Sequence, residues 1–189
     1  MNRRIYHLVL IGLFVSLIFI GAKIIIPLPG VPFSLQRPFV LLSGILLGPK
    51  RGTIAVSLYV LMGLIGIPVF TNGGGFTYMF MPSFGYIIGF IFGALLTGLI
   101  IYKKENPSFG RILLASLFGL FVIYAFGTLY FYLIKQFYLI EDTSISLILM
   151  TCVVPFILKD IIFCIITSLV SLKLIPYLKK KELDRSHFS

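Results

Sequence analysis

The sequence predicts an all-α fold, a single compact bundle of six membrane-spanning helices formed by residues 1–189. Hydrophobic residues make up 59% of the chain and charged residues only 12%, about half the charged share of a soluble domain. The mean hydropathy is +1.08. The apolar residues fall in long runs, and runs of about 18 or more such residues are typical of helices that cross a bilayer.

Six apolar runs account for most of the chain. The first follows Arg3 and Arg4 and continues to Ile26 without a small-residue cleavage site, so we interpret it as a span rather than a signal peptide. The second is short for a full crossing, and we expect it to include part of its flanking loop. Proline, glycine and charged residues mark the connections. The predicted spans are 5–26, 38–47, 52–70, 83–102, 112–134 and 146–175.

Basic residues predict the orientation of the bundle. They precede the first span, follow the last, and fill the connections 48–51 and 103–111, whereas the opposite loops hold only Arg37 and Lys135. The positive-inside rule then predicts a multi-pass plasma-membrane protein with both termini in the cytoplasm and the loops 27–37, 71–82 and 135–145 outside. This distribution explains the net charge of +10 without a nucleic-acid partner.

Ionisable residues inside apolar spans are costly, and Lys23, Lys159 and Asp160 stand out for that reason. All three are expected at a similar depth toward the outer side. Two interpretations are open: a structural ion pair with Lys23 reaching the interface, or an outward-facing polar pocket. The adjacent, deep placement of Lys159 and Asp160 favours the pocket.

Small residues recur at helical spacing on two predicted spans. Gly85, Gly89 and Gly93 lie on one face of the fourth span, where we expect packing inside the bundle. Gly12 and Ser16 lie on one face of the first span, where both internal packing and a partner-docking face are open. In the loop 71–82, Asn72 offers a donor and an acceptor to a ligand, although this segment taken alone favours a plain connector.

The sequence lacks the motifs of an enzyme. It has no phosphate-binding loop, no Ser/His/Asp set and no cluster of metal ligands, so we expect no cofactor and no ATP hydrolysis by the chain itself. Cys152 and Cys164 are predicted on one helix, about 18 Å apart along its axis, which is too far for a disulfide.

Six stretches along the chain form a recognisable set: IPLPGVPFSLQ, FVLLSGILLGPKRG, SLYVLMGLIGIPVF, PSFGYIIGF, GTLYFY and VPFILKDII. They resemble the BioY family, the biotin-specific substrate-binding components of energy-coupling factor transporters, and the resemblance covers nearly the whole chain. It implies a six-helix subunit that binds a vitamin from outside and docks on a transmembrane coupling subunit with two cytoplasmic ATPases. It also implies that Gly12 and Ser16 occupy the family's docking motif.

The resemblance further implies a set of substrate-binding residues. Asp160 matches the family's acid in the last helix, but Phe163 stands where the family has a lysine. Lys159 lies about 40° from that position around the helix and is a replacement candidate for the ligand carboxylate. Further candidates are Arg37, Lys23, Asn72 and Tyr86. The family often has a tryptophan at Leu129; this chain has none, so its aromatic wall must come from Phe or Tyr.

Three functions remain in competition. Biotin offers two ureido N–H donors that suit Asp160, whereas lipoate has a similar acid tail but no such donors. Because the family's lysine is absent at position 163, lipoate or another carboxylated cofactor remains an alternative ligand. A ligand-free structural or assembly protein of the membrane is the alternative from another class, and it leaves the Lys159 and Asp160 pair unexplained.

Overall fold

The structure is a computed structural model that describes residues 3–26, 33–102, 106–141 and 143–186. Residues 27–32 of the predicted first loop and 103–105 of the predicted basic connection lie outside the described residues. The elements are α1 (Arg3–Lys23), β1 (Ile25–Ile26), β2 (Phe33–Ser34), α2 (Gln36–Leu64), the 3₁₀ helix η1 (Phe76–Phe80), α3 (Phe84–Tyr102), α4 (Phe109–Leu133), the π-helix η2 (Ile134–Tyr138), α5 (Ile145–Cys152) and α6 (Val154–Ser186).

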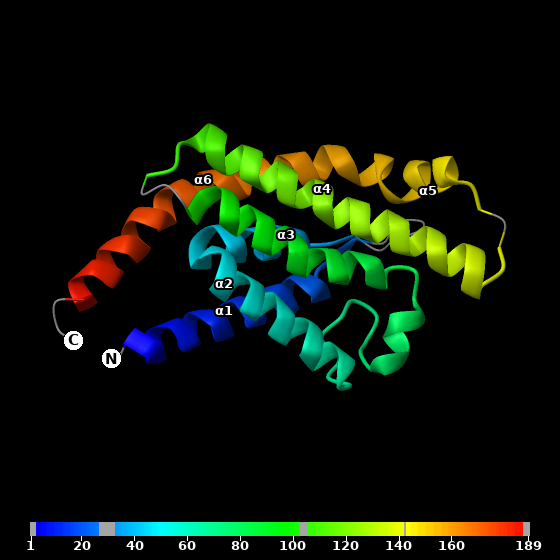
Figure 1. Cartoon of the computed structure of the whole chain (residues 1–189), viewed down its shortest axis with the longest axis horizontal. Helices are drawn as coiled ribbons and strands as arrows, with labels where there is room; N and C mark the ends of the chain where they lie inside the picture. The colour runs from blue at the N-terminus through cyan, green and yellow to red at the C-terminus, as the bar shows by residue number, and fades with distance from the viewer. Residues whose placement is uncertain (1–2, 27–32, 103–105, 142, 187–189) are drawn as a thin grey trace.

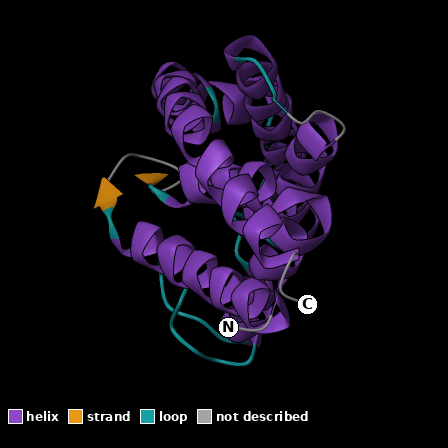
Figure 2. Ribbon diagram, turned by 90° about the vertical axis from the view of Figure 1, so that its left-hand side faces the viewer, coloured by secondary structure: helices purple, strands orange, loops and turns teal. Residues whose placement is uncertain are grey.

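The helices lie side by side along one long axis (Figure 1). The start of α1 and the end of α6 lie at one end of the bundle, the left in Figure 1, and the connections that follow α2 and α4 lie at the other. Figure 2 shows the helices from the end that carries the termini, with the small hairpin at the edge of the bundle. In that hairpin β1 and β2 are antiparallel, with Ile25 opposite Ser34.

The described helices have the length and surface of membrane spans. Five of them are long and apolar enough to cross a bilayer, with α2 counted once. Large apolar side chains face outward, among them Leu8, Phe121 and Leu158, which are 66%, 69% and 72% exposed. In water such surfaces would drive association, whereas lipid tails solvate them. The predicted all-α class is confirmed, and the chain is a membrane protein.

The region of the predicted second and third spans forms one helix with a sharp turn. Gly48 has φ +77° and ψ 177°, which leaves the helical region, and Pro49 follows it. A Cβ on Gly52 would come within 2.6 Å of the Ser43 carbonyl oxygen, so the second half of α2 folds back along the first. The helix ends at Leu64 rather than at residue 70, because Gly66 has φ +105° and Pro68 follows.

Glycines bring α3 against α4, as predicted for Gly85, Gly89 and Gly93. A Cβ on Gly89 would lie 2.9 Å from the Cα of Ile123, and one on Gly93 would lie 2.7 Å from its Cγ1. Because real side chains do not fit at these distances, the two backbones approach as closely as they do only with glycine in place. The internal-packing interpretation is confirmed for this face.

The predicted sixth span, 146–175, is divided in the structure. Helix α5 ends at Cys152 and α6 begins at Val154, with Pro155 in its first turn, the helical position that tolerates proline because its N–H has no partner there. Cys152 and Cys164 therefore lie on different helices, and the prediction of a shared helix was wrong. Both thiols are free and buried.

Candidate functional site

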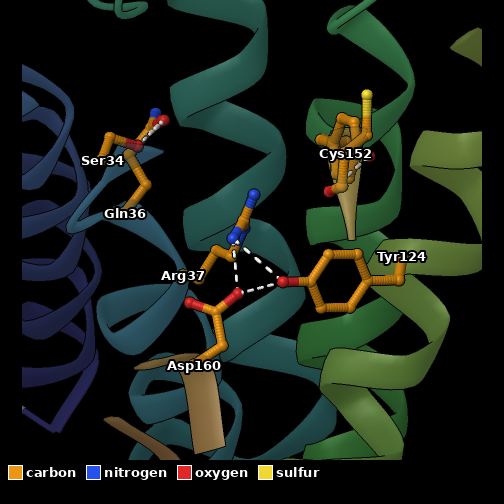
Figure 3. A network of polar contacts seen from close by, with 7 residues as sticks. Ser34, Gln36, Arg37, Tyr124, Cys152 and Asp160 are labelled. Atoms are coloured by element: carbon orange, nitrogen blue, oxygen red, sulfur yellow. Dashed lines mark hydrogen bonds and ion pairs between the residues drawn. The ribbon is translucent and has the colours of Figure 1, made fainter. Parts of the chain in front are cut away.

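A buried salt bridge joins two helices at the centre of the site (Figure 3). Arg37 stands in the first turn of α2 and Asp160 in α6, 123 residues later, and Arg37 Nη1 lies 2.5 Å from Asp160 Oδ2. The two residues are only 5% and 2% exposed. The Tyr124 hydroxyl, on α4, donates to the same carboxylate oxygen and lies 3.4 Å from Arg37 Nη1. Three helices therefore converge on one carboxylate oxygen.

Aromatic rings surround the Arg37 guanidinium. The ring centroids of Tyr124, Tyr86 and Phe156 lie 5.2, 5.5 and 5.7 Å from its Cζ atom. Aromatic faces attract a cation, and this attraction offsets part of the cost of removing the guanidinium from water. These rings also supply an aromatic wall without tryptophan. Breaking a buried ion pair by removing one partner typically costs about 3–5 kcal/mol, so the arrangement favours a charged Arg37 and a charged Asp160 together.

The second oxygen of Asp160 is left without a donor. Asp160 Oδ1 is buried and makes no hydrogen bond to any of the described residues. A buried carboxylate oxygen without a donor carries its full desolvation cost, and native structures rarely leave one in that state. The site therefore offers a strong, unoccupied acceptor next to a cation.

A small open cavity of about 30 Å³ lies beside Arg37, well below the volume of a site that encloses a vitamin-sized ligand. Its wall combines polar and aromatic side chains from the start of α2, the loop after α2 and the start of α3. Burial raises the pKa of Tyr78, so its phenol stays protonated at neutral pH and can donate into the cavity. The lining residues are Ser34, Gln36, Arg37, Thr71, Tyr78, Ser83, Tyr86, Ile87 and Phe90.

Arg37 also lines a narrower space on the other side, together with Asp160. Phe163 borders that space, at the position where the family resemblance implies a lysine. In this chain the cation that meets Asp160 comes from Arg37 on α2. Arg37 is thus common to both spaces, whereas Asp160 lines only the narrower one.

Gln36 connects the cavity wall to the loop after α2. Its Oε1 accepts hydrogen bonds from Ser34 Oγ at 2.8 Å and from Thr71 Oγ1 at 3.3 Å. Its Nε2 donates to the Tyr59 hydroxyl, which in turn donates to the Val69 carbonyl oxygen at 2.9 Å. Figure 3 shows the hydrogen bond between Ser34 and Gln36 near Arg37. Both the oxygen and the nitrogen of the buried Gln36 side-chain amide are therefore hydrogen-bonded.

The structure brings some predicted site residues together and separates others. Arg37, Asp160 and Tyr86 meet at the site. The Lys159 ammonium lies 5.8 Å from the centre of the Phe156 ring, outside the set that lines the cavity. Lys23 is exposed and donates to the Phe70 carbonyl oxygen at 3.0 Å.

Asn72 and the small residues of the first helix lie elsewhere. Asn72 is exposed, and its neighbour Thr71 lines the cavity in its place. Gly12 and Ser16 are exposed on α1, and no atom lies within 4 Å of a Cβ built on Gly12. Ser16 Oγ donates to the Gly12 carbonyl oxygen. Among the described residues, no other element packs against Gly12.

Sequence reasoning missed Tyr124, Gln36 and Thr71. Tyr124 had a signal, because a hydroxyl in the middle of an apolar span needs a hydrogen-bond partner. Gln36 is next to the candidate Arg37 in the sequence, and it is a polar residue just before a predicted span. Thr71 had no comparable signal, since an exposed loop threonine is common.

Comparisons with known proteins identify the family of this chain. Residues 1–180 match the BioY family. The chain is 41% identical over 167 residues to the probable biotin transporter BioY of Lysinibacillus sphaericus, covering 88% of this chain and 85% of that protein. It is 42% identical over 180 residues to the biotin transporter BioY of Thermotoga maritima, covering 95% and 99%.

A solved structure has the same fold. It is the crystal structure of the S-component for biotin from an ECF-type ABC transporter, which matches with a TM-score of 0.81 and 28% sequence identity. The match covers 92% of this chain and 94% of that chain. From the sequence match over nearly the whole length and this shared fold, the chain belongs to the BioY family.

Proposed function

We propose that this chain is the substrate-binding membrane subunit of a vitamin importer and that its ligand is biotin. The family and the named activities of the relatives support this function. The observation that carries it at the level of chemistry is the buried Arg37–Asp160 pair: Arg37 lines the cavity, and Asp160 Oδ1 accepts no hydrogen bond from the described residues.

The ureido group of biotin matches this pair. It presents N–H donors and a carbonyl acceptor side by side, and Asp160 Oδ1 can accept from an N–H while Arg37 donates to the carbonyl oxygen. The tyrosine and phenylalanine rings around Arg37 suit the apolar bicyclic ring of the ligand. Lipoate has no such donors and would leave Asp160 Oδ1 unsatisfied.

The carboxylate of biotin needs a second cation, because its aliphatic chain separates it from the ureido ring. Lys159 remains the predicted partner, whereas Lys23, the substitute that the sequence suggested, donates to the Phe70 carbonyl oxygen. Asn72 remains a candidate polar contact from the loop. These assignments are tested by comparing biotin with its amide, which lacks the charge.

The proposed transport cycle requires partners. The chain crosses the plasma membrane six times, with the two halves of α2 as separate spans and both termini in the cytoplasm. It delivers the vitamin by docking on a coupling subunit that two ATPases drive. The exposed Gly12 and Ser16 support a docking face on α1, because a partner helix can approach closely there.

Calorimetry on the purified subunit tests the ligand. We expect saturable binding of biotin at one site, weaker binding of biotin amide and little binding of lipoate. Mass spectrometry of the small molecule that co-purifies gives an independent identification. Tight lipoate binding with no measurable biotin binding would transfer the assignment to a lipoate-like acid, and binding of neither would favour the ligand-free alternative.

A further inference from the structure

Three successive residues of the loop after α2 are each held by a side chain from a different part of the bundle. Tyr59 OH donates to the Val69 carbonyl oxygen at 2.9 Å, and Lys23 Nζ donates to the Phe70 carbonyl oxygen at 3.0 Å. Thr71 Oγ1 donates to Gln36 Oε1 at 3.3 Å. We call residues 69–71 the anchored segment.

Within the anchored segment, side-chain packing holds the ring of Phe70. Phe70 is fully buried, and its ring lies against Gly63 of α2, where a Cβ would collide with it. Regular secondary structure adds one isolated bridge, in which the Gly73 N–H donates to the Phe70 carbonyl oxygen at 3.3 Å. The carbonyl groups at residues 69 and 70 therefore depend on side-chain donors for part of their hydrogen bonding.

The anchored segment carries the cavity wall. Thr71 lines the cavity together with Gln36, its own hydrogen-bond partner. Tyr59 is fully buried and lies outside the set that lines the cavity, yet its hydroxyl links Gln36 to the backbone of Val69. A residue that does not line the cavity thus connects the two sides of its wall.

We propose that Lys23, Tyr59 and Gln36 are positioning residues that hold residues 69–71 against the bundle, keep Thr71 in the cavity wall and thereby slow the release of the ligand. The role in release rests on the proposed function; the anchoring itself does not. Lys23 then acts through the Phe70 carbonyl oxygen and not through the ligand carboxylate. This assignment separates it from the role that the sequence suggested.

Two substitutions test the anchors. Tyr59→Phe removes the hydroxyl that serves Gln36 and Val69, and Lys23→Met removes the donor to Phe70 while keeping an apolar stem. In the ligand-free protein, hydrogen–deuterium exchange of the peptide covering residues 65–80 should quicken about two- to tenfold, the change that one ordinary hydrogen bond produces. Peptides from α3 and α4 should keep their rates. Lys23→Arg, which retains a donor, should restore slow exchange.

Matched controls make the same chemical changes at the opposite end of the bundle. Tyr102→Phe and Lys50→Met alter exposed side chains outside the site, and we expect wild-type exchange from both. Since Lys23 is also exposed, Lys23→Met keeps the test usable if Tyr59→Phe unfolds the protein. Unchanged exchange of the 65–80 peptide in Lys23→Met would overturn the anchoring role of Lys23.

Dissociation rates test the effect on the ligand. Both variants should release biotin about two- to tenfold faster, and Lys23→Met should weaken biotin and biotin amide equally. A loss confined to biotin would show that Lys23 holds the carboxylate and would overturn its positioning role. Faster exchange with unchanged release would overturn the link to retention. If the wild-type protein binds no biotin, the proposed function fails, and the exchange measurement still decides whether the anchors exist.

Discussion

The two oxygens of Asp160 have different contacts. Oδ2 accepts hydrogen bonds from Arg37 and Tyr124, which fixes the orientation of the carboxylate, and Oδ1 accepts none from the described residues. Binding sites gain affinity when their polar groups are held in place before the ligand arrives. Under the proposed function, Arg37 and Tyr124 thus hold Asp160 Oδ1 in position to accept a hydrogen bond from the ligand.

Asp160→Asn should weaken biotin binding about ten- to a hundredfold, because a hydrogen bond to a charged group contributes about 1.5–3 kcal/mol. Calorimetry with biotin and lipoate measures the change. The substitution also leaves Arg37 buried without its counter-ion, so the melting temperature must be followed in parallel. The double variant Arg37→Met with Asp160→Asn removes both charges and controls for stability. An unchanged affinity for biotin in the Asp160→Asn variant would contradict the assignment.

Lys159→Ala should reduce the affinity for biotin more than the affinity for biotin amide. The amide has no negative charge, so it loses little when the cation is removed. Titration of both ligands into the variant and the wild type gives the comparison. Equal losses for the two ligands would indicate that Lys159 acts on the fold of α6, for example through its contact with Phe156.

Among the elements, α1 is the one with an open small-residue face. Gly12 is exposed with free space around it, in contrast to Gly85, Gly89 and Gly93, where α4 fills the space. The same spacing of small residues therefore has two different outcomes in one chain. The face on α3 differs from the face on α1 only in having a neighbouring helix, and the sequence does not predict which faces have one.

Gly12→Leu and Ser16→Leu should abolish biotin uptake in cells that contain the coupling subunit and the ATPases. Binding by the isolated subunit should stay within about twofold of the wild type, because neither residue lines the cavity. Uptake of labelled biotin and calorimetry provide the two measurements. A loss of binding as large as the loss of uptake would argue against a docking role.

Element type was predictable from the sequence, whereas breaks within elements were not. The span predicted for 83–102 matches α3, Phe84–Tyr102, because an apolar run flanked by polar residues has one compatible structure in lipid. The break at Val153 and the end of α2 at Leu64 lie inside apolar runs. There the backbone follows local proline and glycine residues, which hydropathy does not resolve.

For the whole molecule, the arrangement of ends agrees with an even number of crossings. The start of α1 and the end of α6 lie together, opposite the loop that carries Thr71 (Figure 1). Combined with the charge asymmetry, this arrangement places the cavity toward the outside of the cell in the proposed orientation.

Cysteine labelling in intact cells tests that orientation. A cysteine introduced at the exposed Asn72 should react with a membrane-impermeant reagent, and one at the exposed Ser108 should not. The two natural cysteines are buried and should give little background. Labelling of Ser108→Cys alone would reverse the proposed topology.

The site was predictable as a set of residue types but not as a set of contacts. Arg37, Asp160 and Tyr86 were candidates from the sequence, yet the partner of Asp160 was expected at Lys159 on the same helix. The observed partner is 123 residues away, and Tyr124 approaches from a third helix. Such contacts depend on how the helices pack, and spacing along the chain contains little information about that.

The salt bridge of Arg37 also has a consequence for biosynthesis. The hydrogen bond between Gln36 and Tyr59 spans only 23 residues and can form as soon as α2 has folded back at Gly48. Asp160 leaves the ribosome much later, after α3 and α4, so Arg37 stays without this counter-ion until α6 has been made and packed. The last long helix therefore completes the charge balance of a site whose first residue is made with α2.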